Sequence, residues 1–151
     1  MHLADEAATR ALGARLARVI APGLSLYLHG DLGSGKTTLA RGLLRGLGYT
    51  GLVKSPTYAL VELYTVSRLN LYHFDFYRFR EPKEWRDAGF NEYFNDASVC
   101  LVEWPEKAAG LLPAADLDIR LEFAGDGRDL SVRAGTESGK ACLHKLMQMP
   151  L

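Results

Sequence analysis

The stretch LSLYLHGDLGSGKT, residues 24–37, decides the fold of this chain. A short apolar run, Leu24–Leu28, leads into a turn in which Gly30, Gly35, Lys36 and Thr37 match the pattern G-x4-G-K-[ST]. Helical periodicity begins directly afterwards, with leucines at positions 39, 43, 44 and 47. The motif therefore lies between a strand and a helix, which is the setting that a phosphate-binding loop (P-loop) requires.

Each residue type in this loop has a physical reason. The glycines let the backbone bend around a phosphate chain, and successive N–H groups form an anion-binding nest at a helix N-terminus. Lys36 can reach the β- and γ-phosphates, and the Thr37 hydroxyl can bind Mg²⁺. We therefore expect a nucleoside triphosphate and Mg²⁺ as cofactors. The residues expected to contact the nucleotide here are Asp31, Leu32, Gly33, Ser34, Gly35, Lys36, Thr37 and Thr38.

Length and composition indicate one globular domain over residues 1–151, with ordinary hydrophobic and charged content. The formal net charge is zero, so a nucleic-acid partner would need a local patch or an intermediary protein. No apolar run approaches the length of a membrane span, and the N-terminus lacks a secretory apolar region. Cys100 and Cys142 lack metal-site spacing and are expected to be reduced. These features favour a cytoplasmic protein without a membrane partner.

The remaining periodicity predicts a three-layer α/β fold around a mixed, mostly parallel sheet. Strands are expected over residues 58–64 and 71–77, and their short link favours an antiparallel hairpin. Residues 98–104 read as a buried strand, and residues 117–123 and 130–132 as a hairpin around Gly125-Asp126-Gly127. Helical segments are expected over residues 4–20, 36–47, 81–95 (with turns) and 136–147.

Two carboxylates fall at positions suited to metal binding. Asp75 lies among aromatic residues of a strand, and a buried carboxylate needs a partner. Mg²⁺ is one such partner; a turn, or pairing with Arg78 or Arg80, is the alternative. Glu103 ends a buried strand, and the carboxyl end of a central strand is the ligand edge of an open α/β sheet. Glu103 could therefore ligate Mg²⁺ or polarise the attacking water.

A loop rich in Gly, Ser and Pro follows the P-loop helix. Nucleotide switches often place a γ-phosphate or Mg²⁺ sensor there, so the hydroxyl of Thr57, or of Ser55, is a candidate sensor. The alternative is a plain connecting turn. His73 shares a strand face with Asp75, and a hydrogen-bonded structural role is favoured for it.

Several classes of P-loop protein compete. A GTPase should carry the guanine-reading pattern N-K-x-D, which this sequence lacks. A small-molecule kinase usually adds a lid and an arginine-rich acceptor site, for which Arg78, Arg80 and Arg86 are the candidates. An ATPase that works as a switch in an assembly needs the nest, a sensor and metal-binding acids, and all are present. A nucleotide-binding interaction module without turnover remains an alternative.

Four motifs in this order resemble the TsaE (YjeE) family: Gly30–Thr37, Ser55–Tyr58, His73–Arg78 and Val102–Glu106. The resemblance covers about residues 4–123 and leaves the C-terminal segment unmatched. It implies a cytoplasmic ATPase of bacterial tRNA N6-threonylcarbamoyladenosine biosynthesis. In this pathway a protein complex places the threonylcarbamoyl group on adenosine 37 of tRNA. The implied partners are the threonylcarbamoyl-transferase and that enzyme's inactive-paralogue partner, so that tRNA is engaged indirectly.

The resemblance also implies residue roles. Thr37 and Glu103 would ligate Mg²⁺, Asp75 would be the second acid beside it, and Trp104 would lie near the nucleotide. The Ser55–Thr57 loop would act as a switch. The expected catalytic residues are Lys36, Thr57, Asp75 and Glu103. No arginine is clearly placed to act as a finger, so we expect slow ATP hydrolysis by the chain alone and acceleration by its partners.

Overall fold

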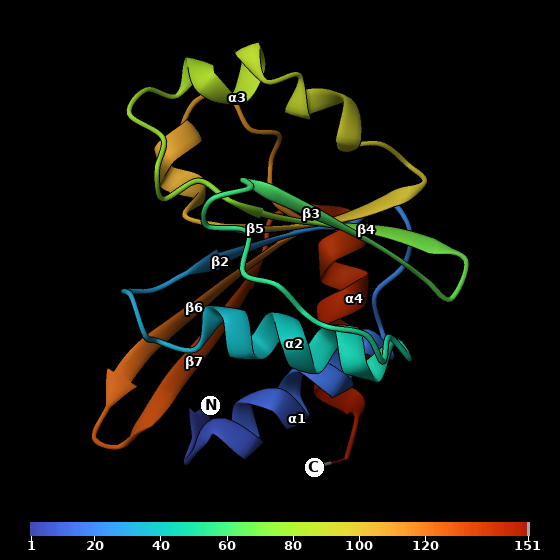
Figure 1. Cartoon of the computed structure of the whole chain (residues 1–151). Coiled ribbons are helices and arrows are strands. Elements are labelled where there is room, and N and C mark those ends of the chain that lie inside the picture. The colour runs from blue at the N-terminus through green and yellow to red at the C-terminus, as the bar shows by residue number, and fades with distance from the viewer. Residues whose placement is uncertain (151) are drawn as a thin grey trace.

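A seven-stranded sheet forms the centre of the computed structural model, which describes residues 1–150 (Figure 1). The strands are β1 (His2–Leu3), β2 (Ser25–His29), β3 (Val61–Val66), β4 (Leu69–Asp75), β5 (Ser98–Glu103), β6 (Leu117–Ala124) and β7 (Gly127–Ala134). Their order in the sheet is β1-β7-β6-β2-β5-β4-β3. The pairings among β6, β2, β5 and β4 are parallel, and the outer pairings are antiparallel. The predicted mixed sheet with a parallel core is confirmed.

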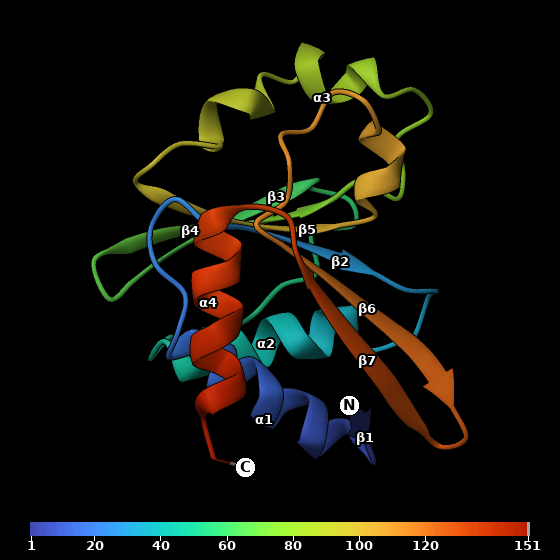
Figure 2. The ribbon, with the colours of Figure 1, turned by 180° about the vertical axis from the view of Figure 1, so that it is seen from behind.

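Helices cover both faces of the sheet, as the three-layer prediction requires. The helices are α1 (Glu6–Ala17), α2 (Lys36–Gly46), α3 (Lys83–Asp87) and α4 (Glu137–Gln148), with short 3₁₀ turns at Phe90–Tyr93 and Pro105–Ala108. Helices α1, α2 and α4 lie on one face, and α3 with the 3₁₀ turns lies over the other (Figures 1 and 2). The sheet therefore separates two apolar cores.

The two cores differ in chemistry. The one beneath α1, α2 and α4 is aliphatic and contains the buried leucines of the P-loop helix, Leu39, Leu43 and Leu44. The one beneath α3 is aromatic and includes the fully buried Phe74 and Phe76. Among residues 1–150, no helix is long and apolar enough to cross a membrane.

The α1–α2 pair holds the P-loop helix against the sheet. Asp5 caps α1, because its carboxylate accepts the Ala8 N–H at 2.8 Å. The two helices then cross with their backbones in close contact at Gly13 and Gly42, where neither residue has room for a Cβ atom. Helix α1 is shorter at both ends than the expected range of residues 4–20.

The hairpin of β3 and β4 confirms the antiparallel prediction and corrects its boundaries. Val66 pairs with Leu69, so the link is the two residues Ser67 and Arg68, both with positive φ as in a type I′ turn. The expected strand start at Tyr58 is wrong, because residues 57–59 form a turn and Leu60 has a φ of 70°. This turn carries Thr57 toward the carboxyl end of β4.

Candidate nucleotide-binding site

The P-loop connects β2 to α2 in a backbone conformation that glycine permits. Gly30 has a φ of 149°, and a Cβ there would lie 2.5 Å from Ser34 Oγ and 2.6 Å from Leu121 O. Gly35 has a φ of 108° and begins α2 without a side-chain cap. The first N–H groups of α2 therefore have no side-chain partner at the cap, which is the arrangement that binds anions at a helix N-terminus.

A pocket of about 210 Å³ opens where the P-loop meets the carboxyl ends of β4 and β5. Its lining residues are Leu32, Gly33, Gly35, Lys36, Thr37, Thr38, Thr57, Asp75, Glu103 and Trp104. All of them were expected from the sequence to contact nucleotide or metal or to take part in catalysis. The expected contacts Asp31 and Ser34 do not line this pocket: Asp31 is exposed, and the buried Ser34 lines a neighbouring hollow.

The ammonium of Lys36 lies at this pocket. Its Nζ donates a hydrogen bond to Gly30 O at 2.6 Å and lies 3.6 Å from the centroid of the Trp104 ring. Burial lowers the pKa of Lys36, while the nearby charges of Glu103 and Asp75 act in the opposite direction. Trp104 reaches this place through a left-handed backbone, with a φ of 57°. A cation is thus held beside the anion-binding helix end.

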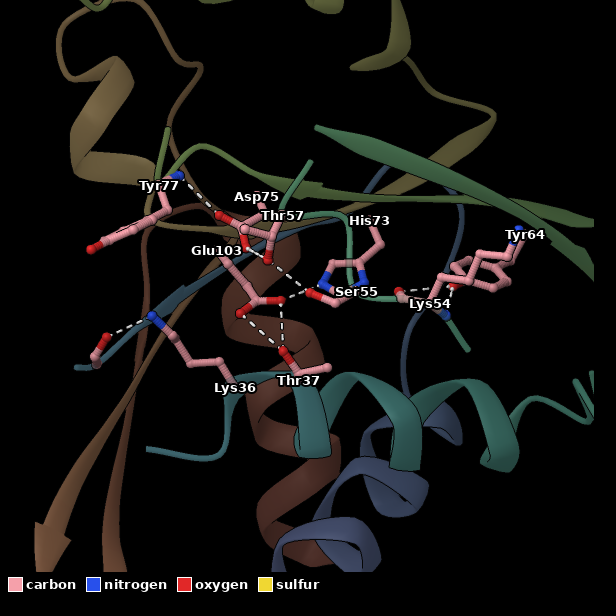
Figure 3. Close-up of polar contacts among 11 residues, drawn as sticks. Lys36, Thr37, Lys54, Ser55, Thr57, Tyr64, His73, Asp75, Tyr77 and Glu103 are labelled. Atoms are coloured by element: carbon pink, nitrogen blue, oxygen red, sulfur yellow. Dashed lines mark hydrogen bonds and ion pairs between the residues drawn. The ribbon is translucent and has the colours of Figure 1, made fainter. Parts of the chain in front are cut away.

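The two acids lie next to each other because Asp75 and Glu103 are register partners in the parallel β4–β5 pair. The Thr37 hydroxyl lies 3.4 Å from Glu103 Oε1 and 3.3 Å from Oε2 (Figure 3). Asp75 Oδ2 accepts the Thr57 hydroxyl at 3.2 Å, and Asp75 Oδ1 accepts the Tyr77 N–H at 2.9 Å. The candidate sensor Thr57 is therefore bonded directly to one of the acids.

Burial raises the pKa of Asp75, and the charge of Glu103 raises it further, while the bonds from Tyr77 and Thr57 lower it. Of the alternatives expected for Asp75, the turn is formed, because Asp75 Oδ1 accepts the Tyr77 N–H. Over the described residues 1–150, neither Arg78 nor Arg80 forms an ion pair with Asp75, and the Arg78 guanidinium lies 4.0 Å from the centroid of the Tyr58 ring. Two adjacent carboxylates in partial burial favour a cation between them.

This donor set fits Mg²⁺. Thr37, Asp75 and Glu103 offer only oxygen ligands, which Mg²⁺ prefers, and Mg²⁺ commonly completes its shell with waters and substrate phosphates. Within the described part of the chain, no group of three or more His, Cys, Asp or Glu side chains could hold a metal ion. The chemistry is that of a metal shared with phosphate rather than of an all-protein cage.

His73 hydrogen-bonds to Glu103. Its Nε2 lies 2.6 Å from Glu103 Oε2, and the two side chains are 0% and 4% exposed. The hydrogen-bonded role favoured from sequence thus has a specific partner at the candidate site. The spacing of residues on one strand could not identify it, because the partner lies on the neighbouring strand β5.

Sequence reasoning missed Arg128 of β7, which contacts the P-loop backbone. Its Nε donates to Ser34 O at 3.0 Å, and its Nη2 donates to Gly33 O at 3.1 Å. A second hollow of about 300 Å³ lies here, between the start of α1, the P-loop and the β6–β7 turn. It shares Gly33, Gly35 and Thr38 with the first pocket. In the sequence, Arg128 is followed by Asp129 in an expected hairpin, and nothing in this pattern indicates a contact with the P-loop.

Comparison with known proteins adds a family-level finding. Residues 3–130 match the family model described as threonylcarbamoyl adenosine biosynthesis protein TsaE. A protein from Haemophilus influenzae named tRNA threonylcarbamoyladenosine biosynthesis protein TsaE is 42% identical over 144 residues, covering 92% of this chain and 91% of that protein. A Bacillus subtilis protein of the same name is 43% identical over 118 residues, covering 78% of this chain and 73% of that one.

A solved structure agrees with these matches. The crystal structure of YdiB from Bacillus subtilis superposes with a TM-score of 0.85 at 33% sequence identity. The superposition covers 98% of this chain and 93% of that chain. The similarity therefore includes the P-loop, both acids and the C-terminal segment that matched no sequence pattern.

Proposed function

Because the chain belongs to the TsaE family, we propose that it is the ATP-binding and ATP-hydrolysing component of tRNA N6-threonylcarbamoyladenosine biosynthesis. The observation that carries the proposal is the meeting of the α2 N-terminus, Lys36, Thr37 and the acid pair Asp75–Glu103 at one pocket. The names of the relatives support the pathway, and the geometry of the pocket supports the nucleotide chemistry.

The phosphates occupy the first pocket in this proposal. The N–H groups of the P-loop and the Lys36 ammonium hold their oxygens. The nucleoside extends into the second hollow, since the two hollows share the rim formed by Gly33, Gly35 and Thr38. Arg128, which also lines the second hollow, fixes that rim through its bonds to two P-loop carbonyls.

Hydrolysis proceeds by in-line attack of water on the γ-phosphate. Thr37, Glu103 and Asp75 would hold Mg²⁺, and the ion would supply charge neutralisation on the phosphate oxygens. Lys36 and the backbone amides stabilise the charge that develops on the transferring group, because they are already oriented by the fold. Thr57 belongs to the loop between α2 and β3, and its hydroxyl is hydrogen-bonded to Asp75. Because Asp75 lines the phosphate pocket, the position of this loop depends on what occupies the pocket.

Slow turnover by the chain alone is part of the proposal. Across residues 1–150 no arginine lines the phosphate pocket, and an arginine finger is typically worth about 10³–10⁵ in kcat. The threonylcarbamoyl-transferase and its inactive-paralogue partner would accelerate turnover, and hydrolysis would reset their complex. The zero net charge agrees with indirect engagement of tRNA.

The test measures phosphate release from ATP and from GTP, for the chain alone and with the transferase pair added. We expect ATP-selective release that rises several-fold with the pair. Lys36→Ala should abolish nucleotide binding or turnover, and Glu103→Ala should lower Mg²⁺-dependent turnover. Lys140→Ala is the matched control, because this exposed lysine follows a Ser-Gly pair but lies on α4 beside Glu137.

Each contrary outcome points elsewhere. Vigorous ATP hydrolysis without partners would contradict the activation step. Unchanged rates in both Lys36→Ala and Glu103→Ala would overturn the site assignment. Phosphate transfer to a metabolite without any protein partner would favour the small-molecule kinase, and tight ATP binding with no release under any condition would favour an interaction module.

A further inference from the structure

One buried hydrogen bond decides how the carboxylate of Glu103 is turned. His73 Nε2 lies 2.6 Å from Glu103 Oε2, whereas the Thr37 hydroxyl lies almost equally far from both oxygens, at 3.4 and 3.3 Å (Figure 3). A contact that is shared between both oxygens does not select which of them faces the pocket. The short bond from His73 does, because it commits Oε2 to the ring and leaves Oε1 toward the pocket.

The direction of this bond follows from the partners. An ionised carboxylate only accepts hydrogen bonds, so Nε2 is the donor. The other ring nitrogen, Nδ1, is buried and has no hydrogen-bond partner within the described residues. The ring therefore presents one fixed donor to Glu103.

The cost of this arrangement argues against a purely structural role. His73 is fully buried in β4, next to Leu71 and Phe74, which are also fully buried. A leucine at this position would fill the space and remove the unpaired Nδ1, and a buried polar atom without a partner costs free energy. The ring therefore leaves one buried polar atom unpaired, and its one hydrogen bond is the bond to Glu103.

We propose that His73 is a positioning residue that holds Glu103 with one oxygen directed at the phosphate pocket. The inference rests on the proposed function, in which Glu103 ligates Mg²⁺ at the nucleotide. The hydrogen bond lets Glu103 enter the metal shell already oriented. Groups that orient a metal ligand typically change metal affinity or activity by about 10–100-fold when they are removed.

The test compares three substitutions with the parent chain. His73→Leu removes the donor at similar volume, and His73→Gln can place an N–H near the position of Nε2. His73→Asn carries the same amide on a shorter side chain that does not reach that position. His144→Leu is the matched control, since this histidine is exposed on α4. Calorimetric titration of ATP at a series of Mg²⁺ concentrations gives the Mg²⁺ dependence of ATP affinity without requiring turnover, and thermal unfolding is measured alongside.

We expect His73→Leu and His73→Asn to need about 10–100-fold more Mg²⁺ for the same gain in ATP affinity. His73→Gln and His144→Leu should stay close to the parent chain. ATP binding without Mg²⁺ should be the same in all five proteins. Two opposed effects set the unfolding temperature of His73→Leu, because this variant removes the unpaired Nδ1 but leaves the buried Glu103 carboxylate without its donor. A merely structural histidine would not make the Mg²⁺ dependence follow the reach of the donor, which is kept in His73→Gln and lost in His73→Asn.

Two results would overturn the inference. One is a Mg²⁺ dependence in His73→Leu within about twofold of the parent, a difference well below that typical of such groups. The other is a glutamine variant as impaired as the asparagine variant, which would mean that donation to Glu103 is irrelevant even if the leucine variant fails to fold. A parent chain that binds no ATP at any Mg²⁺ concentration would instead refute the proposed function itself.

Discussion

The close backbone contact between α1 and the P-loop helix α2 can be tested directly by Gly42→Ala. A Cβ at position 42 would lie 2.3 Å from Arg10 O, 2.8 Å from Arg10 Cα and 2.9 Å from the Arg10 carbonyl carbon. All three atoms belong to the backbone of α1, so no side-chain rotation can relieve the contact. The shortest of these distances is about 1 Å below the 3.4 Å of ordinary contact, so α1 must move by about that amount.

The expected loss of stability follows from two opposed effects. Overpacking in a close-packed interior costs about 1–3 kcal/mol, and a backbone obstacle places this case at the upper end. Replacing glycine by alanine inside a helix returns about 1 kcal/mol. The net expectation is a destabilisation of about 2 kcal/mol, or a fall in Tm of about 4–8 °C for a domain of this size.

Urea unfolding followed by circular dichroism measures this change, with the m-value unchanged if the denatured state is unaffected. Gly13→Ala provides an internal control, because a Cβ there would lie 2.5 Å from Leu39 O across the same interface. The double variant should lose less than the two single losses combined, since one displacement of α1 relieves both clashes. A Gly42→Ala protein as stable as the parent would refute the backbone contact between α1 and α2.

Three further expectations concern the site and the buried thiols. Asp75→Asn should stabilise the nucleotide-free chain by about 0.5–2 kcal/mol at neutral pH. Burial raises the pKa of Asp75, so its ionised form destabilises the folded state, and the gain measured by urea unfolding should shrink as the pH falls toward 3.8. A gain that stays constant over this pH range would contradict the reasoning. Arg128→Ala should weaken ATP binding measured by calorimetry by about tenfold, about 1.4 kcal/mol, whereas substitution of the exposed Arg133 by alanine should not. Equal effects of the two substitutions would contradict a role for the bonds from Arg128 to the P-loop carbonyls. Burial raises the pKa of the Cys100 thiol to about 12 and also raises the pKa of Cys142. A thiol reagent at pH 8 should therefore label neither cysteine in the native protein and both in urea. Rapid labelling of the native protein would contradict this burial.

Local patterns were sufficient to predict most of the fold. The strand–turn–helix around Gly35 and the antiparallel hairpin before Asp75 are encoded by residues that are close in the chain, and both are confirmed. The two-residue strand β1 could not be predicted, because His2–Leu3 is defined only by its pairing with β7. Likewise, the start of β3 depends on the left-handed conformation of Leu60, which hydrophobic alternation does not encode.

The candidate site was predictable wherever the sheet geometry alone brings residues together. Glu103 was expected at the ligand edge because it ends a buried strand. The strand expected over residues 71–77 continued past Asp75, whereas β4 ends at Asp75 and its register with β5 brings the two acids together. The contacts of Arg128 and His73 depend on side chains that cross from one strand or hairpin to another element. Such contacts are set by packing between distant segments, and one sequence contains no local signal for them.

The left-handed turn at Trp104 has an optical consequence. The chain contains two tryptophans, and the structure places them in opposite surroundings. Trp85 is buried in the aromatic core, where its ring meets Phe94 edge-on at 5.9 Å, whereas Trp104 faces the Lys36 ammonium at the phosphate pocket. A ligand that draws Lys36 away changes the electrostatic environment of one indole and leaves the other untouched. The intrinsic fluorescence of the protein thus contains both a sensor of pocket occupancy and an internal reference.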